Sequence, residues 1–134
     1  MIAVLDASAA IELVFKRPFH RRIEAEIEHA SAVIAPELYI SEVSNAFWKY
    51  SRLIKDARIL DDRLLDTAID LVDNCASARE LYREAYAFSC QWNHPVYDSM
   101  YIVLARRNDA ILVSIDKRMR DLAGKNKLKT FSLK

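Results

Sequence analysis

Four acidic residues, far apart in the chain, each stand where a strand or a helix is expected to begin or end. Asp6 follows the apolar run 2–5 and Asp116 follows the apolar run 111–115, whereas Glu42 and Asp98 stand near the starts of two predicted helices. In a parallel α/β sheet the ligand crevice lies at the carboxyl ends of the strands, so acids placed there can converge. Carboxylates gathered in one pocket repel each other unless a cation neutralises them, and hard oxygen ligands suit Mg²⁺ or Mn²⁺. This pattern indicates metal-assisted hydrolysis of a phosphate ester.

Each of these acids also has a purely structural explanation. Asp6 and Asp116 can serve as helix N-caps, and Asp98 in a first helical turn gains from the helix dipole. Glu42 and Asn45 lie three residues apart on one helix and can form a solvated flank. The position of Asp98 favours an acidic metal-binding cluster over four unrelated caps. Asp98 shares a helix face with apolar residues at spacings of three, four and seven, namely Tyr101, Ile102 and Ala105. An unpaired carboxylate on a buried face is costly, and a metal ion would remove that cost.

The periodicity of the apolar residues predicts strands and helices that alternate along the chain. Strands are expected at 2–6, 32–35 and 110–115, with a last strand near 128–132. Residues 74–78 are ambiguous, because a third strand would suit the topology but the residue types hardly favour one. Helices are expected at 7–16, 19–30, 36–55, 57–73, 79–92, 96–107 and 117–123. The alternation predicts a three-layer α/β/α sandwich with a short central parallel sheet, and residues 37–73 form an extra helical hairpin.

Length and composition predict a single globular domain over residues 1–134. The net charge is +1, so the chain has no bulk electrostatic signature of nucleic-acid binding, and any such binding requires a local separation of charges. Met1 leads directly into a strand-like run without a basic segment, which predicts no signal peptide. No apolar stretch is long enough for a membrane span. We therefore expect a cytoplasmic protein in which Cys75 and Cys90 are free thiols.

Four segments, in order and at suitable separations, carry a family resemblance. They are Val4-Leu5-Asp6-Ala7-Ser8, Glu42-Val43-Ser44-Asn45, the run 97–105 that begins Tyr97-Asp98-Ser99, and Leu112-Val113-Ser114-Ile115-Asp116. With these segments the chain resembles PIN-domain proteins, specifically the VapC-type ribonuclease toxins of prokaryotic toxin–antitoxin pairs. The resemblance spans nearly the full length, and the ordered set is more specific than any single segment.

The resemblance implies a single PIN-like nuclease domain and a metal-dependent endoribonuclease that cuts single-stranded or structured RNA. It implies that one or two Mg²⁺ or Mn²⁺ ions are held by an acidic quartet consisting of Asp6, Glu42, Asp98 and Asp116. It also implies that the quartet is supported by hydrogen bonds from Ser8, Asn45 and Ser114, for which cap or turn chemistry is the alternative. A homodimer and a small antitoxin protein whose tail blocks the acidic pocket are the implied partners.

Three features depart from the family's usual pattern. The segment 74–78 is a poor strand, and Arg107-Asn108-Asp109 replaces a glycine often found before the last main strand. Asn108 can take the left-handed conformation in its place. Met119 occupies a position where some relatives carry a further acid, which weakens the prediction of a second metal ion. His94, close to Asp98 in sequence, is interpreted as part of a helix-start turn.

Basic and aromatic residues offer weaker signals. One basic cluster lies at the first helix junction (Lys16, Arg17, His20, Arg21 and Arg22), and another follows Asp116 (Lys117, Arg118 and Arg120). Both can hold an RNA backbone beside the acids, or can simply be solvated surface. Trp48 falls off the apolar face of its helix, so it is expected either at an interface or packed under the 57–73 helix.

Two other functions compete with the nuclease. A phosphatase-like domain with Asp6 as its nucleophile would normally need a second aspartate two residues later, where Ser8 stands. A catalytically silent PIN-like module that binds RNA or protein is the second alternative. The presence of all four acids argues against silence, because the loss of one would be its simplest sign.

Overall fold

The structure is a computed structural model that describes residues 1–53 and 61–133. Its centre is a parallel sheet with the strand order β3-β2-β1-β4. The strands are β1 (Ile2–Leu5), β2 (Ala32–Pro36), β3 (Asn74–Ala76) and β4 (Ile111–Val113). In the register of the sheet, Val4 pairs with Ile34 on one side and with Leu112 on the other. Because all four strands run the same way, their carboxyl ends meet at one edge.

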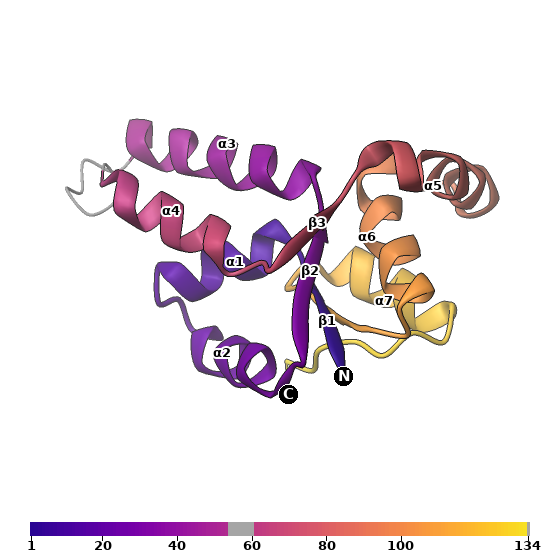
Figure 1. Ribbon diagram of the computed structural model, residues 1–134, viewed down its shortest axis with the longest axis horizontal. Coiled ribbons are helices and arrows are strands. Elements are labelled where there is room, and N and C mark those ends of the chain that lie inside the picture. Colours follow the sequence, from indigo (N-terminus) through magenta and orange to yellow (C-terminus); the bar gives the residue numbers. More distant parts are fainter. Residues whose placement is uncertain (54–60, 134) are drawn as a thin grey trace.

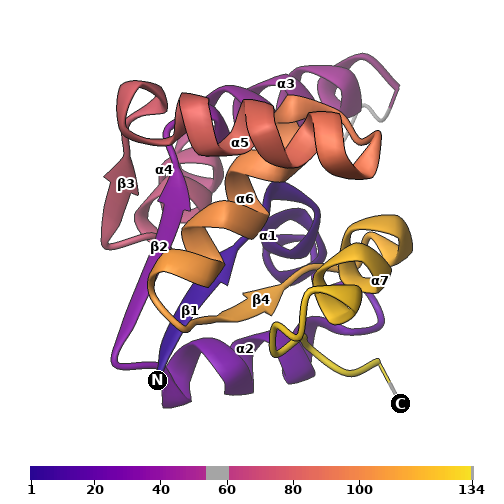
Figure 2. The same cartoon turned by 90° about the vertical axis from the view of Figure 1, so that its right-hand side faces the viewer.

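Helices cover both faces of this sheet (Figures 1 and 2). One face carries α1 (Ala7–Val14), α2 (His20–His29), α3 (Leu38–Leu53) and α4 (Asp62–Asp70). The other carries α5 (Ala78–Trp92), α6 (Val96–Arg107) and α7 (Lys117–Lys125). The predicted three-layer α/β/α architecture is thus confirmed, with α3 and α4 lying side by side as the extra helical pair. The predicted ends of two helices, within 54–60, lie outside the described residues.

The core explains why β1 and β4 read as continuous apolar runs. Val4, Leu5, Leu112 and Val113 are fully buried, as expected for strands that are covered by helices on both faces. The core extends into α6 through Ile102 and its neighbours. Because the core holds the strands in place, the residues that follow each strand at its carboxyl end take defined positions.

The ambiguous segment near residue 75 forms a true strand. Ala76 pairs with Pro36, and the Asp73 side chain accepts a hydrogen bond of 2.8 Å from the backbone N–H of Val33. The Asp73 N–H in turn donates to the Val33 carbonyl at 2.8 Å. This reciprocal contact fixes the register of β3, which the weak strand propensity of its residues cannot do alone.

The expected strand at 128–132 is wrong. The segment makes one parallel bridge, between Leu112 and Thr130, in which the Leu112 N–H donates to Lys129 and the Phe131 N–H donates to the Leu112 carbonyl, each at 2.9 Å. Phe131 is buried in the core. This one pair of hydrogen bonds is enough to place Phe131, so the segment packs on the edge of β4 without a longer ladder.

The turn that replaces the family's glycine differs by one residue from the prediction. Asp109, with a φ of 47°, takes the left-handed conformation. Asn108 has a φ of −105° and instead donates its side-chain amide to the carbonyl of Leu104 at 2.9 Å, at the end of α6. Aspartate tolerates the left-handed region nearly as well as asparagine, so the turn is kept without glycine.

Two further observations bear on the sequence predictions. Cys75 and Cys90 are exposed free thiols. Within the described ranges, no helix is both long enough and apolar enough to cross a membrane.

Candidate active site

Asp6 is built into the junction between β1 and α1. Its backbone N–H donates to Val113 at 3.1 Å, which continues the pairing with β4 for one residue beyond the strand. Its side chain caps α1 by accepting a hydrogen bond of 3.0 Å from the N–H of Ala9. Only 4% of Asp6 is exposed. The capping role that the sequence offered as an alternative is therefore real, and it coexists with a position at the carboxyl edge of the sheet.

Two serine hydroxyls link Asp6 to the turn after β4. Ser8 donates to Oδ1 of Asp6 and Ser114 donates to Oδ2, both at 2.7 Å. The Ser8 oxygen accepts from the N–H of Ile115 at 3.3 Å, and the Ser114 oxygen accepts from the N–H of Asp116 at 3.0 Å. Burial raises the pKa of Asp6 to about 6, although these hydrogen bonds act in the opposite direction. The two serines thus hold a carboxyl group that its surroundings make hard to ionise.

Asp116 lies at the start of α7. One of its oxygens, Oδ1, accepts from the N–H groups of Arg118 and Met119 at 3.0 and 3.3 Å, while the other makes no hydrogen bond within the part of the chain that the structure describes. The negative charge of Asp116 contributes to the raised pKa of Asp6. Asp116 is therefore both a helix cap and a close electrostatic neighbour of Asp6.

Glu42 reaches the same region from α3. Its Oε1 accepts a hydrogen bond of 2.6 Å from the hydroxyl of Tyr101, a residue of α6 that is 1% exposed. Burial raises the pKa of Glu42, the Tyr101 hydroxyl lowers it, and the charges of Asp6 and Asp98 raise it further. The sequence pattern placed Tyr101 on the buried face of its helix but did not identify it as the partner of Glu42.

Asp98 is paired with His94. The histidine Nε2 and Oδ2 of Asp98 are 3.0 Å apart, and the His94 side chain is only 7% exposed. Burial raises the pKa of Asp98, His94 lowers it, and Asp116 raises it. The turn from α5 to α6 places His94 here, because Asn93 ends α5 in the left-handed conformation. The interpretation of His94 as only a helix-start turn missed this contact, although its i, i+4 spacing from Asp98 was a signal.

The Tyr101 contact leads to a prediction. Tyr101→Phe removes the hydroxyl that donates to Glu42, so we expect the pKa of Glu42 to rise further and the free energy of unfolding to fall by about 1 kcal/mol. A carboxyl-detected NMR titration measures the first quantity and chemical denaturation the second. Tyr97→Phe is the matched control, because Tyr97 lies on the same helix and is 68% exposed. An unchanged Glu42 titration would contradict the predicted role of the hydroxyl.

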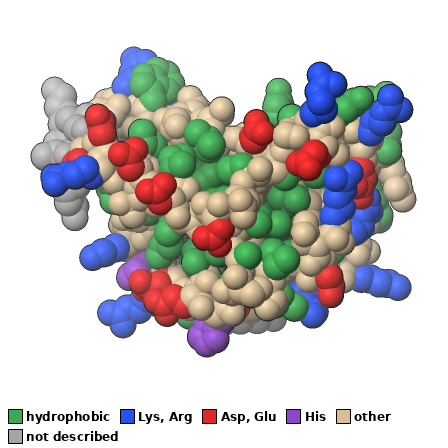
Figure 3. Space-filling view, viewed as in Figure 1, with side chains coloured by type: hydrophobic (Ala, Val, Ile, Leu, Met, Phe, Trp, Pro, Cys, Tyr) green, Lys and Arg blue, Asp and Glu red, His purple; other side chains and the backbone are tan. Residues whose placement is uncertain are grey.

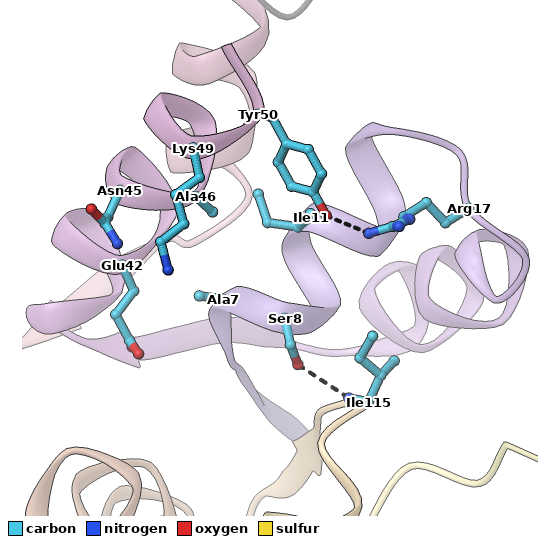
Figure 4. Close-up of a pocket in the computed structure, with 10 residues that line it drawn as sticks. All are labelled: Ala7, Ser8, Ile11, Arg17, Glu42, Asn45, Ala46, Lys49, Tyr50 and Ile115. Atoms are coloured by element: carbon cyan, nitrogen blue, oxygen red, sulfur yellow. Dashed lines mark hydrogen bonds between the residues drawn. The ribbon is translucent and has the colours of Figure 1, made fainter. Parts of the chain in front are cut away.

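A pocket of about 350 Å³ opens beside these acids, between α1 and α3 (Figure 4). Ser8 and Glu42 belong to its lining. Asn45 lines it as well, yet it makes no hydrogen bond within the described residues, so the supporting role implied by the resemblance has no contact behind it here. Of the quartet and its three expected supports, Asn45 is the member that the structure does not connect to the rest.

The basic residues are distributed around this region. Arg17, from the first predicted cluster, lines the pocket, and Arg118, from the second, lies close enough to Asp98 to lower its pKa. On the face drawn in Figure 3, Lys and Arg side chains project mainly from the rim, and hydrophobic side chains gather near the middle. Basic side chains from both predicted clusters therefore lie near the acids. Trp48 is half-exposed as expected, with the Arg52 guanidinium 5.3 Å from its ring centroid.

The donor chemistry of the four acids suits a hard divalent cation. All four offer carboxylate oxygens, and Glu42, Asp98 and Asp116 each keep one oxygen without a hydrogen bond among the described residues. As these side chains stand, however, no three His, Cys, Asp or Glu residues in the described ranges form a group that could hold a metal ion. Met119, at the position of the further acid, is buried in the core. Metal binding by the quartet thus remains a prediction.

Comparison with known families decides the classification. The family model for the PIN domain matches residues 3–125. The chain belongs to the PIN-domain family. Among curated proteins, this PIN domain is similar to Ribonuclease VapC3 of Pyrobaculum aerophilum, with 24% identity over 126 residues that cover 90% of this chain and 94% of the relative. The resemblance to PIN-domain proteins of the VapC type is confirmed.

Solved structures share the PIN fold. The crystal structure of PAE2754 from Pyrobaculum aerophilum has a TM-score of 0.72 at 22% identity, covering 91% of this chain and 87% of that one. VapBC2 from Rickettsia felis, bound to a DNA fragment from its promoter, has a TM-score of 0.62 at 14% identity and covers 97% of both chains. FitAcB from Neisseria gonorrhoeae has a TM-score of 0.61 at 16% identity, covering 98% of this chain and 97% of that one. At these identities the likeness concerns the fold.

Proposed function

We propose that this PIN domain is a metal-dependent endoribonuclease and acts as the toxin of a toxin–antitoxin pair. The observation that carries the proposal is the group of four acids at one edge of the sheet, where burial raises the pKa of Asp6, Glu42 and Asp98 and their charges act on one another. Such a group is short of positive charge and attracts a cation. The name of the Pyrobaculum relative, a ribonuclease, supports RNA as the substrate.

The ion that we propose is Mg²⁺ or Mn²⁺, held by Asp6, Glu42, Asp98 and Asp116. When bound, such an ion lowers the pKa of water and neutralises charge that develops on a phosphate ester. The catalytic chemistry thus depends on how well the chain positions these carboxylates. No side chain other than these acids needs to act as the base.

Each proposed ligand is positioned by groups of the chain itself. Ser8 and Ser114 fix both oxygens of Asp6, so this carboxylate cannot rotate freely. Tyr101 holds one oxygen of Glu42 and His94 holds one oxygen of Asp98, and in both cases the second oxygen is left for a ligand. Fixed orientation of the groups around a metal is the usual way in which a protein tunes metal affinity and activity.

The proposal includes partners. Two of the similar structures, VapBC2 and FitAcB, carry names of complexes, and VapBC2 is bound to promoter DNA. By analogy we propose a small antitoxin protein that blocks the acidic pocket, and a homodimer of this chain. A cytoplasmic location is proposed with them, because the RNA target and the antitoxin would be met there.

Incubation of the purified protein with a labelled RNA pool tests this function. We expect cleavage with Mg²⁺ or Mn²⁺ and none in EDTA, together with a saturable Mn²⁺ signal measured by electron paramagnetic resonance. Cleavage that persists in EDTA would contradict metal dependence. Retention of RNA without cleavage under any metal would favour the binding-module alternative instead.

A further inference from the structure

The pocket between α1 and α3 has the size of a ligand site and lies beside the acids. Its volume of about 350 Å³ lies within the range of small-ligand sites, roughly 300–1,000 Å³. One wall comes from α1 through Ala7, Ser8 and Ile11, and the other comes from α3 (Figure 4). A pocket of this size beside a proposed cleavage site is positioned to take a neighbouring part of the substrate.

The pocket and the acidic edge share side chains. Ser8 lines the pocket and donates to Asp6, and Glu42 lines the pocket and accepts from Tyr101. Ile115, which directly precedes Asp116, closes the end near β4. A ligand that fills the pocket therefore lies against the same groups that hold the carboxylates.

Two basic side chains line the pocket, one toward each end. Lys49 lies seven residues after Glu42, which is two helical turns, on the same face of α3, or about 10 Å along the helix axis. In Figure 4 the Lys49 side chain extends from α3 toward Glu42 and Ala7, and Arg17 lies at the opposite end, beyond Tyr50. Acids at the edge of the pocket and a lysine within it match a strand whose one phosphate is cut and whose next phosphate is only held.

An ordered aromatic group lies between these charges. The Arg17 guanidinium donates to the Tyr50 hydroxyl at 2.5 Å and lies 5.6 Å from the ring centroid. The Tyr50 ring also packs edge-on against Phe15, with centroids 5.2 Å apart. Ile11, Ala7 and Ala46 continue the apolar lining from Tyr50 toward Glu42. Bases of single-stranded nucleic acid stack on aromatic groups without strong sequence preference.

We propose that this pocket is a subsite for one nucleotide of single-stranded RNA next to the bond that is cut. The base lies on the apolar wall beside Tyr50, and the phosphate lies beside Lys49. This inference rests on the proposed nuclease function and specifies where its substrate lies. A basic peptide tail, the alternative occupant, would meet repulsion from Arg17 and Lys49.

Binding of a fluorescent single-stranded RNA in EDTA, where no cleavage is expected, tests the subsite first. Lys49→Ala is expected to weaken binding about 10-fold and to reduce the magnitude of the salt slope by about 0.7, the value for one phosphate contact in a single strand. Ala46→Phe fills the pocket and is expected to weaken RNA binding by a similar factor. Lys129→Ala, an exposed lysine outside the pocket, is the matched control and is expected to stay within about 2-fold.

A second measurement places the nucleotide relative to the cut. In a substrate with a mapped cleavage site, each phosphate is replaced in turn by an uncharged methylphosphonate. A methylphosphonate at one position beside the cut is expected to lower the cleavage rate of the wild type about 10-fold. The same replacement is expected to leave the cleavage rate of Lys49→Ala unchanged.

The outcomes separate the subsite from the nuclease function. Equal RNA binding by wild type, Lys49→Ala and Lys129→Ala would overturn the subsite, and would point to a protein segment as the occupant, while metal-dependent cleavage by the wild type would leave the nuclease standing. Binding that depends on Lys49 without cleavage of any RNA would overturn both the nuclease and the place of the subsite beside a cut bond.

Discussion

Asp6→Asn is expected to reduce metal-dependent RNA cleavage by about 10²- to 10³-fold and to leave the fold intact. Asparagine keeps the shape of the side chain but removes the charge that would bind the cation. It can keep the local hydrogen bonds, because its carbonyl can accept from Ser8 and the N–H of Ala9, and its amide can donate to the oxygen of Ser114. Single-turnover cleavage at saturating Mn²⁺ measures the loss, and circular dichroism measures the fold.

Asp121→Asn is the matched control for this variant. Asp121 is exposed on α7, where it accepts a hydrogen bond of 2.9 Å from Lys117, and the substitution removes the same charge from the protein. Its cleavage rate is expected to stay within about 2-fold of the wild type, because exposed ion pairs contribute little. Equal rates for both variants and the wild type would exclude Asp6 from the reaction and would overturn the acidic site.

The sequence predicted the sheet well where burial leaves a simple pattern. Continuous apolar runs identified β1 and β4, because strands covered on both faces need no alternation. The segments at 74–76 and 128–132 were harder to predict. Asn74–Ala76 forms a strand through the reciprocal contact between Asp73 and Val33, which are 40 residues apart, and no local signal reports such a contact. Residues 128–132 were predicted to form a strand, but the segment makes a single bridge and is held in place by the buried Phe131.

Of the groups that hold the candidate carboxylates, the sequence predicted Ser8 and Ser114, which donate to Asp6, but missed Tyr101 and His94. Asp6 and Asp116 follow strands, so the sequence indicates a helix-cap role for each as readily as a metal-ligand role. Tyr101 and Glu42 are 59 residues apart, so their contact follows only from the packing of α3 against α6. Asn45, by contrast, was predicted to support the site. It lines the pocket three positions from Glu42, yet it makes no hydrogen bond within the described residues.

In EDTA, the wild type is expected to lose stability relative to Asp6→Asn as the pH rises from about 4 to above 6. The pKa of Asp6 is about 6 in the folded protein and 3.8 in the unfolded reference. Between these values the folded state binds a proton that the unfolded state has released, so the free energy of unfolding falls as the pH rises through this window. A shift of this size corresponds to roughly 3 kcal/mol once Asp6 is fully ionised. Denaturant unfolding of both proteins at pH 4, 5, 6 and 7 measures the difference.

The same experiment with Mn²⁺ connects stability to the proposed function. Glu42 and Asp98, whose pKa values are also raised, titrate in both proteins, so most of their contribution cancels in the difference between wild type and variant. Because the charge of Asp6 raises the pKa of Glu42, the difference reports Asp6 together with this coupling. Mn²⁺ at 100 times its dissociation constant is expected to stabilise the wild type at pH 7 by about 2.7 kcal/mol, and the variant by much less. A cation that binds the folded carboxylates thus offsets the cost of burying them. Parallel stability curves for the two proteins in EDTA would mean that Asp6 titrates normally, and the physical reason to expect a cation at this edge of the sheet would be lost.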